Sequence, residues 1–293
     1  MPGMKTGIIG GSGLYAMDGL MQKKWVTVAT PFGKPSDQYL TGNLAGHEIV
    51  FLPRHGRGHR ILPSELNHRA NLYGLKKLGV TRVISVSAVG SLQEQYKPAD
   101  IVVIDQFFDR TKQSQDFTFF GDGVVAHVSF ADPVCGSLRK VLVACGRQAG
   151  ATIHDGGTYV NMEGPAFSTR AESRFHRAMG WDVIGMTNLG EAHCAREAEL
   201  CYATLAMITD YDCWHVSAET VTVEMIIDCL QKNSRMAQEI IRLAVTHPPT
   251  GAACECQHAL AQAIMTQPSL IPPGQRRKLN LLIGKYLPKK SVR

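Results

Sequence analysis

Three short segments carry residue types that suit an anion. Gly10-Gly11-Ser12-Gly13 combines backbone N–H groups with a hydroxyl, and glycine-rich turns of this kind can surround an anion. Arg54-His55 adds a planar guanidinium and an imidazole, which suit a phosphate or a carboxylate. Ser87-Ala88 precedes Val89-Gly90, where small side chains leave backbone amides accessible. Together these segments predict an anion site, and an ordinary turn or surface position is the alternative for each.

A second set of residues suits a polar heterocycle. Asp210 and Asp212 flank Tyr211, so their carboxylates can point together where the chain turns and accept hydrogen bonds from a purine amino group. A carboxylic acid whose pKa is raised by burial can also protonate a leaving base. The alternative is a helix cap or a solvated acid pair. Met186-Thr187 is a similar case, because methionine is usually a core residue.

The glycine segment also permits another interpretation. Gly11 to Ala16 matches the dinucleotide pattern G-x-G-x-x-A, which would indicate a nicotinamide-dependent oxidoreductase. However, no amphipathic helix pattern follows, and no acid ends a strand about 20 residues later to bind a ribose hydroxyl. The residues therefore favour an anion-binding turn over NAD, with a structural turn as the remaining alternative. A Walker lysine, a His-Glu metal motif and a nucleophile elbow do not occur.

These segments follow apolar and β-branched runs that predict strands. The runs cover 7–9, 48–54, 82–89, 100–108, 158–162, 182–187 and 202–210. Helical patterns lie between them, over 63–78, 132–150, 169–180, 191–200 and 220–245. The alternation predicts an α/β fold, a central mixed sheet with helices on both faces. The carboxyl ends of the strands would then bring the polar segments together. We expect one domain over 1–246 and a C-terminal helical tail over 247–293.

Local signals predict where three helices begin. Ser64 is a candidate N-cap for the first helix, and Asp132-Pro133 combines a capping residue with proline at the first helical position. Thr169 and Glu172 have the spacing of a capping box.

Composition excludes several classes of protein. Of the 293 residues, 44% are hydrophobic and 19% are charged, which excludes a disordered chain and collagen. No apolar run approaches the roughly 20 residues that span a bilayer, and the first residues lack a signal-peptide pattern, so we expect a soluble cytosolic protein.

The formal net charge is +6, but residues 276–293 hold seven bases and no acid. The remainder is nearly neutral, and no nucleic-acid or membrane partner is expected.

Eight cysteines are present, and without a secretory signal they are expected to be free thiols. Only Cys254-Glu255-Cys256 is distinctive. A redox pair or a metal site near His247 or His258 is an open alternative, although no second ligand pair follows at a recognisable spacing. The expectation is therefore that the chain holds no metal.

Six segments, taken together, resemble the methylthioadenosine phosphorylase family, the trimeric branch of the purine nucleoside phosphorylases. They are 7–13, 30–37, 54–56, 105–111, 163–172 and 209–214, in order and with similar spacing. The resemblance runs from Gly7 to about Val245. It implies that phosphate attacks C1′ of methylthioadenosine and releases adenine and 5-methylthioribose 1-phosphate. Phosphate would be a co-substrate, no cofactor would be needed, and the assembly would be a homotrimer.

The resemblance also assigns residues to parts of the substrates. The phosphate site would comprise Ser12, Arg54, His55, Ser87 and the amide of Ala88. The sugar would rest on Met186 with Thr187 alongside, and the base would lie near Phe167 and meet Asp210 and Asp212. Val223 and Ile227 would wall the methylthio pocket, and His127 would reach into a neighbouring subunit's site.

Two departures from the family pattern lie near these residues. Ala166 stands where the family usually has arginine, and Gly190 stands where proline is common, which could loosen the loop after Met186.

Paired acids predict a preference for 6-aminopurines, because a 6-oxo group would leave buried acceptors unsatisfied. A purine nucleoside or methylthioinosine phosphorylase acting on 6-oxopurines is the nearest alternative. A nucleosidase and a non-catalytic nucleoside-binding protein are further ones.

Overall fold

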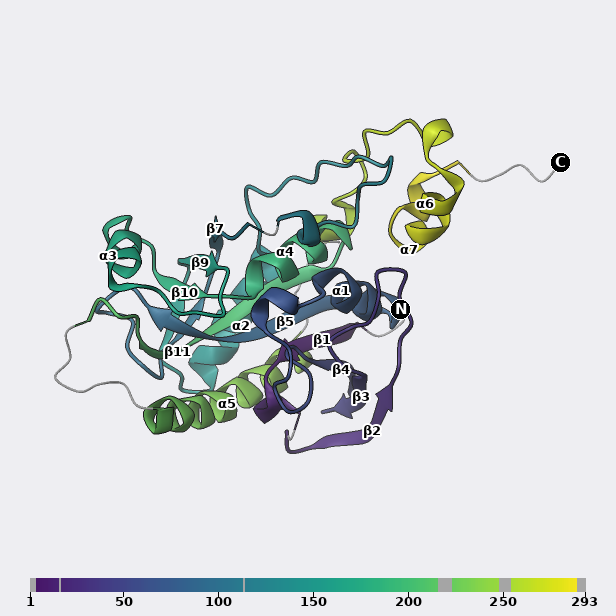
Figure 1. Ribbon diagram of the computed structural model, residues 1–293. Coiled ribbons are helices and arrows are strands. Elements are labelled where there is room, and N and C mark those ends of the chain that lie inside the picture. The colour runs from purple at the N-terminus through teal and green to yellow at the C-terminus, as the bar shows by residue number, and fades with distance from the viewer. Residues whose placement is uncertain (1–3, 16, 113, 216–222, 248–253, 289–293) are drawn as a thin grey trace.

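The computed structural model describes residues 4–15, 17–112, 114–215, 223–247 and 254–288, with only the backbone for 12, 114, 115, 223–228 and 230. A mixed sheet passes through the centre, and helices cover both of its faces (Figure 1). The strands are β1 (Lys5–Gly10), β2 (Leu20–Val26), β3 (Tyr39–Leu44), β4 (His47–Pro53), β5 (Val80–Ser91), β6 (Ile101–Val103), β7 (Gln106–Arg110), β8 (Ile153–Asp155), β9 (Thr158–Met162), β10 (Val183–Gly185) and β11 (Cys201–Tyr211). The α-helices are α1 (His68–Lys77), α2 (Gly136–Gln148), α3 (Arg170–Ala178), α4 (Asn188–Glu197), α5 (Val223–Thr246), α6 (Pro273–Lys278) and α7 (Asn280–Ile283).

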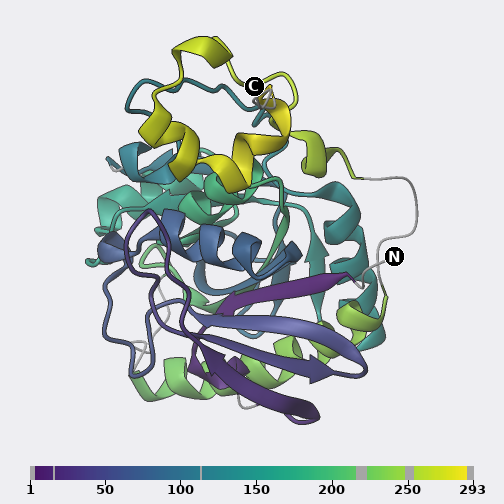
Figure 2. The same cartoon turned by 90° about the vertical axis from the view of Figure 1, so that its right-hand side faces the viewer.

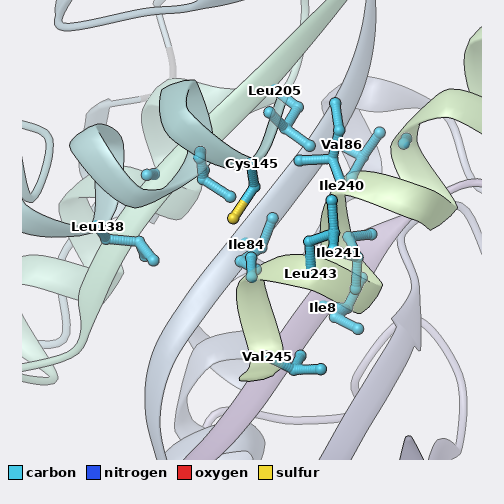
Figure 3. Packing of buried hydrophobic residues seen from close by; sticks show 14 of the residues in the cluster. Ile8, Ile84, Val86, Leu138, Cys145, Leu205, Ile240, Ile241, Leu243 and Val245 are labelled. Atoms are coloured by element: carbon cyan, nitrogen blue, oxygen red, sulfur yellow. The ribbon is translucent and has the colours of Figure 1, made fainter. Parts of the chain in front are cut away.

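The two faces of the sheet bury alternate residues of the same strands. Ile8 of β1 and Ile84 of β5 pack with α2 and α5 (Figure 3). Their neighbours Ile9 and Val83 pack with α1 and α4. Successive strand residues point to opposite faces, so a strand covered on both sides is apolar throughout. The predicted α/β class, with its mixed sheet between helices, is confirmed.

Helices α6 and α7 lie on the α1 and α4 side of the sheet, where Figure 2 shows them in yellow. Leu279, Leu282 and Ile283 are buried in the same apolar cluster as residues of α1 and α4. Two of the tail's bases pair within the chain, since Lys285 lies 2.6 Å from Glu199 and Lys278 lies 3.5 Å from Asp122. None of the described helices is long and apolar enough to cross a membrane.

Strand β5 is the branch point of the sheet. On one edge it runs parallel to β11, which leads on to β6 and β8. On the other edge it pairs with two different strands. Strand β1 pairs with it as far as Ser85 and leads to β4, β3 and β2, whereas β10 pairs with Gly90 and Ser91 and leads to β9 and β7.

A gap separates these two branches. Within the described residues, no strand pairs with Val86–Val89 on the edge that β1 and β10 share, although β11 pairs with them on the other edge. The interruption lies in the middle of a 12-residue strand. It leaves four consecutive residues beside open space.

The expected strands agree with observed ones except for the run 100–108, which forms two strands, β6 and β7, with different partners. Strands β2, β3 and β8 were not predicted. Most of β2 is exposed, with polar Gln22, Lys23 and Lys24 in its centre, so it lacks the apolar pattern that identifies a buried strand.

The helix starts follow the local signals in one case of three. Thr169 accepts a hydrogen bond from the amide of Glu172, and the Glu172 carboxylate accepts one from the amide of Thr169, which confirms the capping box. The Ser64 prediction is wrong because Pro63–Glu65 forms a separate 3₁₀ turn, and Asn67 caps α1 by accepting from Ala70. Asp132-Pro133 is also not a start, since α2 begins at Gly136.

Candidate active site

The gap in the sheet opens into a cavity of about 730 Å³. Its floor is the unpaired stretch of β5, because Val86, Ser87, Ala88, Val89 and Gly90 all line it. Ala88 is exposed although the strand around it is buried, which is the consequence of facing this space. Residues that follow β1 and β4 complete the lining, together with the carboxyl ends of β10 and β11, the residues just after them and one face of α5. The predicted convergence at the strand ends is confirmed.

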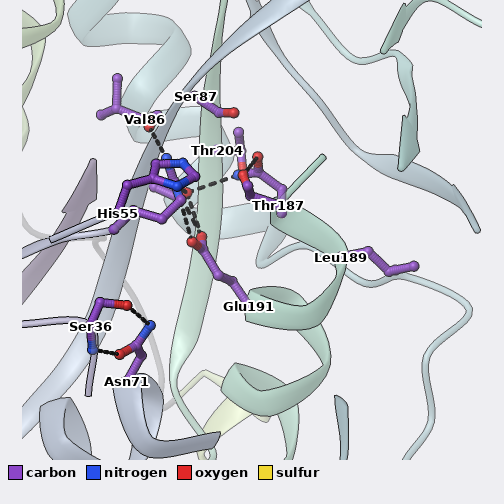
Figure 4. Close-up of polar contacts among 12 residues, drawn as sticks. Ser36, His55, Asn71, Val86, Ser87, Thr187, Leu189, Glu191 and Thr204 are labelled. Atoms are coloured by element: carbon purple, nitrogen blue, oxygen red, sulfur yellow. Dashed lines mark hydrogen bonds and ion pairs between the residues drawn. The ribbon is translucent and has the colours of Figure 1, made fainter. Parts of the chain in front are cut away.

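One end of the cavity is formed by His55, Ser87 and Thr187, which come from three different elements and surround the same space, with Glu191 beneath them (Figure 4). Arg54 lines this end too, but it is only 4% exposed. Its Nη1 donates to the carbonyl of Val86 at 2.8 Å. Nε donates to Oε1 of Glu191 at 2.5 Å. Arg54 therefore presents its charge to the cavity as one half of an ion pair.

Glu191 is a site residue that the sequence did not predict. It lies in the first turn of α4, 137 residues from Arg54. Burial raises its pKa, but the charge and hydrogen bonds of Arg54 outweigh that effect and hold the pKa below its usual value. Its Oε2 accepts from the Ser85 hydroxyl at 2.7 Å, and the Asn188 side chain donates to Ser85 at 2.8 Å. No local pattern could reveal this network, because its members meet only in the folded chain.

Gly190 lies inside α4 and not in a loop, which corrects the expectation that it loosens the chain after Met186. A Cβ at this position would lie 2.5 Å from Cδ2 of His68 and 2.8 Å from Cδ1 of Phe117. The small residue therefore lets α4 approach α1 closely and holds the neighbouring Glu191 under the cavity.

His55 faces the cavity as a neutral ring. Burial and the positive charge of Arg54 lower its pKa from the usual 6.5 to about 4. Its Nδ1 lies 2.8 Å from the carbonyl oxygen of Ile61, and a carbonyl can only accept, so Nδ1 carries the proton. Nε2 is then an acceptor. A neutral His55 suits a partly protonated phosphate, because its Nε2 can accept the phosphate's own O–H.

The opposite end of the cavity holds the two acids. Burial raises the pKa of Asp210, the Thr209 hydroxyl 2.7 Å from Oδ2 opposes that rise, and the charge of Asp212 adds to it. Asp212 is 9% exposed, and its Oδ2 has no hydrogen-bond partner among the described residues. A buried carboxylate oxygen without a partner is energetically costly, so a ligand donor fits this position.

Gly90 of β5 lies beside the two acids and is the register partner of Asp210. A Cβ there would be 3.4 Å from both Oδ1 of Asp210 and Cβ of Asp212, and 3.2 Å from Ile184. The backbone of β5 therefore approaches the paired acids to van der Waals distance, and the tightest neighbour of an added Cβ would be Ile184.

The residues predicted to contact the sugar and the base also line the cavity. Met186 and Thr187 line the cavity directly after β10. Phe167 also lines it, yet its side chain is 81% exposed. An aromatic ring this exposed in a single chain contributes little apolar enclosure unless something else covers it.

Four of the predicted residues are not tested by side-chain geometry in this cavity. Ser12 begins a 3₁₀ turn between the lining residues Gly11 and Gly13, and Val223 and Ile227 lie in the first turns of α5. The side chains of these three residues fall outside the described part of the structure. His127 is exposed and is not among the residues that line the cavity.

Helix α5 contributes polar lining that was not predicted. The residues are Gln231, Ser234, Arg235 and Gln238. Gln238 donates to the carbonyl of Gly13 at 2.6 Å, so the helix is tied to the glycine turn across the cavity mouth. The sequence showed only the apolar stripe of this helix, and the polar residues beside it have no motif of their own.

The sequence that builds this cavity matches a known protein family. The family model described as the phosphorylase superfamily matches residues 5–246. The chain belongs to the phosphorylase superfamily. The matched region contains every element that lines the cavity, from the glycine turn to α5.

Relatives and solved structures of this family cover nearly the whole chain. S-methyl-5′-thioadenosine phosphorylase of Koribacter versatilis is 57% identical, with 96% of each chain covered. The Geobacter sulfurreducens protein of that name is also 57% identical, over 96% of this chain and 98% of its own. A crystal structure of a methylthioadenosine phosphorylase from an antarctic soil metagenomic library is 47% identical, covers 96% of this chain and 99% of its own, and has a TM-score of 0.89. The Schistosoma mansoni enzyme in complex with adenine is 40% identical, with a TM-score of 0.77 over 83% of this chain and 91% of its own.

Proposed function

We propose that this chain catalyses the phosphorolysis of S-methyl-5′-thioadenosine to adenine and 5-methylthioribose 1-phosphate. One observation carries the proposal: a single cavity joins an end suited to phosphate with an end that carries paired acids. Close relatives that carry the name of this activity support it. The phosphate end comprises Arg54, His55, Ser87 and the amide of Ala88.

In the proposed reaction a phosphate oxygen forms a bond to C1′ while the bond from C1′ to N9 breaks. The electron pair of that bond passes to adenine. The sugar develops oxocarbenium character, which the adjacent phosphate anion stabilises. Holding phosphate and nucleoside in one cavity also removes the entropy cost of a bimolecular encounter. Adenine leaves poorly as an anion, so a proton must reach it as the bond breaks.

Asp210 is the proposed proton donor and Asp212 the proposed acceptor. Burial and its neighbour Asp212 raise the pKa of Asp210, which favours the protonated form that could donate to N7. Oδ2 of Asp212, which has no partner among the described residues, would accept a hydrogen bond from the N6 amino group. A 6-oxopurine offers a carbonyl at that position, and two acceptors would face each other. The proposal therefore includes a preference for 6-aminopurines.

The remaining assignments complete the proposal. Met186 and Thr187 would contact the ribose, Phe167 the base, and Val223 and Ile227 the methylthio group, with Ser12 on the phosphate. His127 would act in the site of a neighbouring subunit, so the active form would be a cytosolic homotrimer. An active monomer in sedimentation would exclude the His127 contact.

A phosphate-dependent release assay tests the function. Adenine should be released from methylthioadenosine only when phosphate is present, together with an equal amount of methylthioribose 1-phosphate. Release without phosphate would indicate a nucleosidase. Faster release of hypoxanthine from methylthioinosine or inosine would favour the 6-oxopurine alternative. Binding of methylthioadenosine with no product would indicate a non-catalytic protein.

A further inference from the structure

Four cysteine side chains meet on the side of the sheet that α2 and α5 cover, away from the cavity at the gap. Cys135 precedes α2, Cys201 is the first residue of β11, and Cys254 and Cys256 lie at the 3₁₀ turn of the C-terminal segment. Their sulfur atoms all lie within 4.8 Å of one another, and those of Cys135 and Cys254 are 3.5 Å apart. All eight cysteines of the chain are free thiols in the structure.

The arrangement has the dimensions of a tetrahedral metal site. Sulfur atoms bound to zinc at about 2.3 Å lie roughly 3.8 Å from each other in a tetrahedron. All the sulfur–sulfur distances in the cluster fall under 4.8 Å, so a small contraction would place the four sulfurs around one ion. Two disulfides would bring the sulfurs together in two separate pairs. Here all four sulfurs lie within 4.8 Å of one another.

A second cavity reaches the cysteine cluster, and charged side chains lie around it. This cavity of about 550 Å³ reaches three of the four thiols and shares no lining residue with the larger one. Cys254 is partly exposed to it, and Arg196 also lines it. Arg82 is the register partner of Cys201 on β5, and its buried Nη1 has no hydrogen-bond partner among the described residues. Two guanidinium groups thus lie near a site that would carry net negative charge, while two acids, Asp132 and Glu255, line the same cavity.

The thiolate is the form of cysteine that binds metal, so an ion that enters the cluster would displace protons from the four thiols.

We propose that Cys135, Cys201, Cys254 and Cys256 bind one thiophilic divalent cation, of which zinc is the best example. The ion joins the C-terminal segment, which supplies two ligands, to the first residues of α2 and β11, which supply one each. This differs from the expectation of no metal drawn from the sequence. That expectation considered His247 and His258 as companions of the Cys-x-Cys motif, whereas the companions are cysteines more than 50 residues earlier in the chain.

The test uses the full chain, purified without a histidine tag or chelator and kept reduced. Zinc content by plasma mass spectrometry should be about one ion per chain, as a four-ligand site requires. Apoprotein titrated with Co²⁺ should develop a thiolate-to-cobalt charge-transfer band and the visible bands of a tetrahedral site, saturating at about one equivalent. Absence of these bands in reduced, folded apoprotein would overturn the proposal.

Variants locate the site. Cys254→Ser with Cys256→Ser should lose the cobalt bands and most of the zinc, while the matched control Cys145→Ala, a buried cysteine outside the cluster, should keep both. Equal metal in the double variant would exclude these ligands. Disulfides within the cluster, found by alkylation and mass spectrometry in protein prepared with zinc present, would also contradict the proposal. The measurement does not depend on phosphorolysis, so it succeeds or fails independently of the proposed activity.

Discussion

Nε of Arg54 lies 2.5 Å from Oε1 of Glu191, and the two side chains are 4% and 1% exposed. The cation at the proposed phosphate end of the cavity is therefore already paired within the protein. His55 beside it is neutral at physiological pH because its pKa is lowered to about 4. A dianionic phosphate would thus be held mainly by oriented hydrogen-bond donors. The Arg54 guanidinium would interact with the phosphate and with the Glu191 carboxylate at the same time.

Glu191→Gln tests that arrangement. Removing one charge of a buried pair leaves the other uncompensated, so the free energy of unfolding should fall by about 3 kcal/mol in phosphate-free buffer. Phosphate then meets an unpaired guanidinium and should restore more stability to the variant than to the wild type. Urea unfolding with and without phosphate measures both effects.

Glu197→Gln is the matched control on the same helix. Burial raises the pKa of Glu197 to about 7, so this carboxyl is about half protonated at neutral pH, and because none of the described cations is paired with it, its replacement should change stability less. If the two variants lose the same stability and respond equally to phosphate, the ion pair between Arg54 and Glu191 does not account for either effect.

Asp210→Asn tests the proton donor. The amide cannot protonate N7, so kcat for methylthioadenosine should fall by about 10²- to 10⁴-fold, the usual contribution of general acid catalysis. KM for phosphate should change little, because Asp210 lies at the other end of the cavity. Steady-state kinetics with each substrate varied in turn give the two values.

The pH profile provides the control for Asp210. Because the residue acts in its protonated form, kcat of the wild type should decline as the pH rises through its raised pKa. The Asn variant should lack that decline. Nearly full activity of the variant on methylthioadenosine would rule out the proton-donor role.

Asp212→Asn tests the choice of base. An amide can donate as well as accept, so a 6-oxo group would find a partner where the carboxylate rejects it. The ratio of kcat/KM for methylthioadenosine to that for methylthioinosine should fall by at least about tenfold. A ratio unchanged from the wild type would mean that other residues select the 6-substituent.

His68 should contribute to loss of stability in acid. It is buried beside α4, and burial lowers its pKa from 6.5 to about 4. The unfolded chain binds a proton at the ordinary histidine pKa while the folded chain does not. The free energy of unfolding should therefore decrease as the pH falls from about 6.5 toward 4.

His68→Asn should remove part of that dependence. Between pH 7 and pH 4.5 the variant should lose about 2 kcal/mol less than the wild type, the amount expected for a shift of this size. Urea denaturation at several pH values in phosphate-free buffer provides the comparison. Parallel curves for the two proteins would show that His68 ionises alike in both states.

How much could be predicted from the sequence depended on whether a residue's role is local. The capping box at Thr169 and the apolar runs of β1, β4 and β5 are local, and they were predicted correctly. The α/β class followed from their alternation. By contrast, Asp132-Pro133 has the local form of a helix start, yet the helix begins at Gly136.

The site shows the same division. Arg54 and His55 follow β4, and Ser87 and Asp210 lie near the carboxyl ends of β5 and β11. Because these strand ends converge, position in the sequence indicated their common site. Glu191, Ser85 and the polar face of α5 depend on contacts across the fold, which no spacing reveals. The cysteine cluster is the extreme case, because Cys135 and Cys254 meet across 119 residues of chain.

The gap beside Val86–Val89 has a mechanical consequence. The branch that contains β1 and β4 and the branch that contains β10 and β9 join the same edge of β5 at separate places, and the proposed substrates would lie between them. A nucleoside and a phosphate would then occupy the position of a missing strand and bridge the two halves of the sheet. We expect the occupied protein to be stiffer than the empty one, with the substrates themselves as the connecting piece.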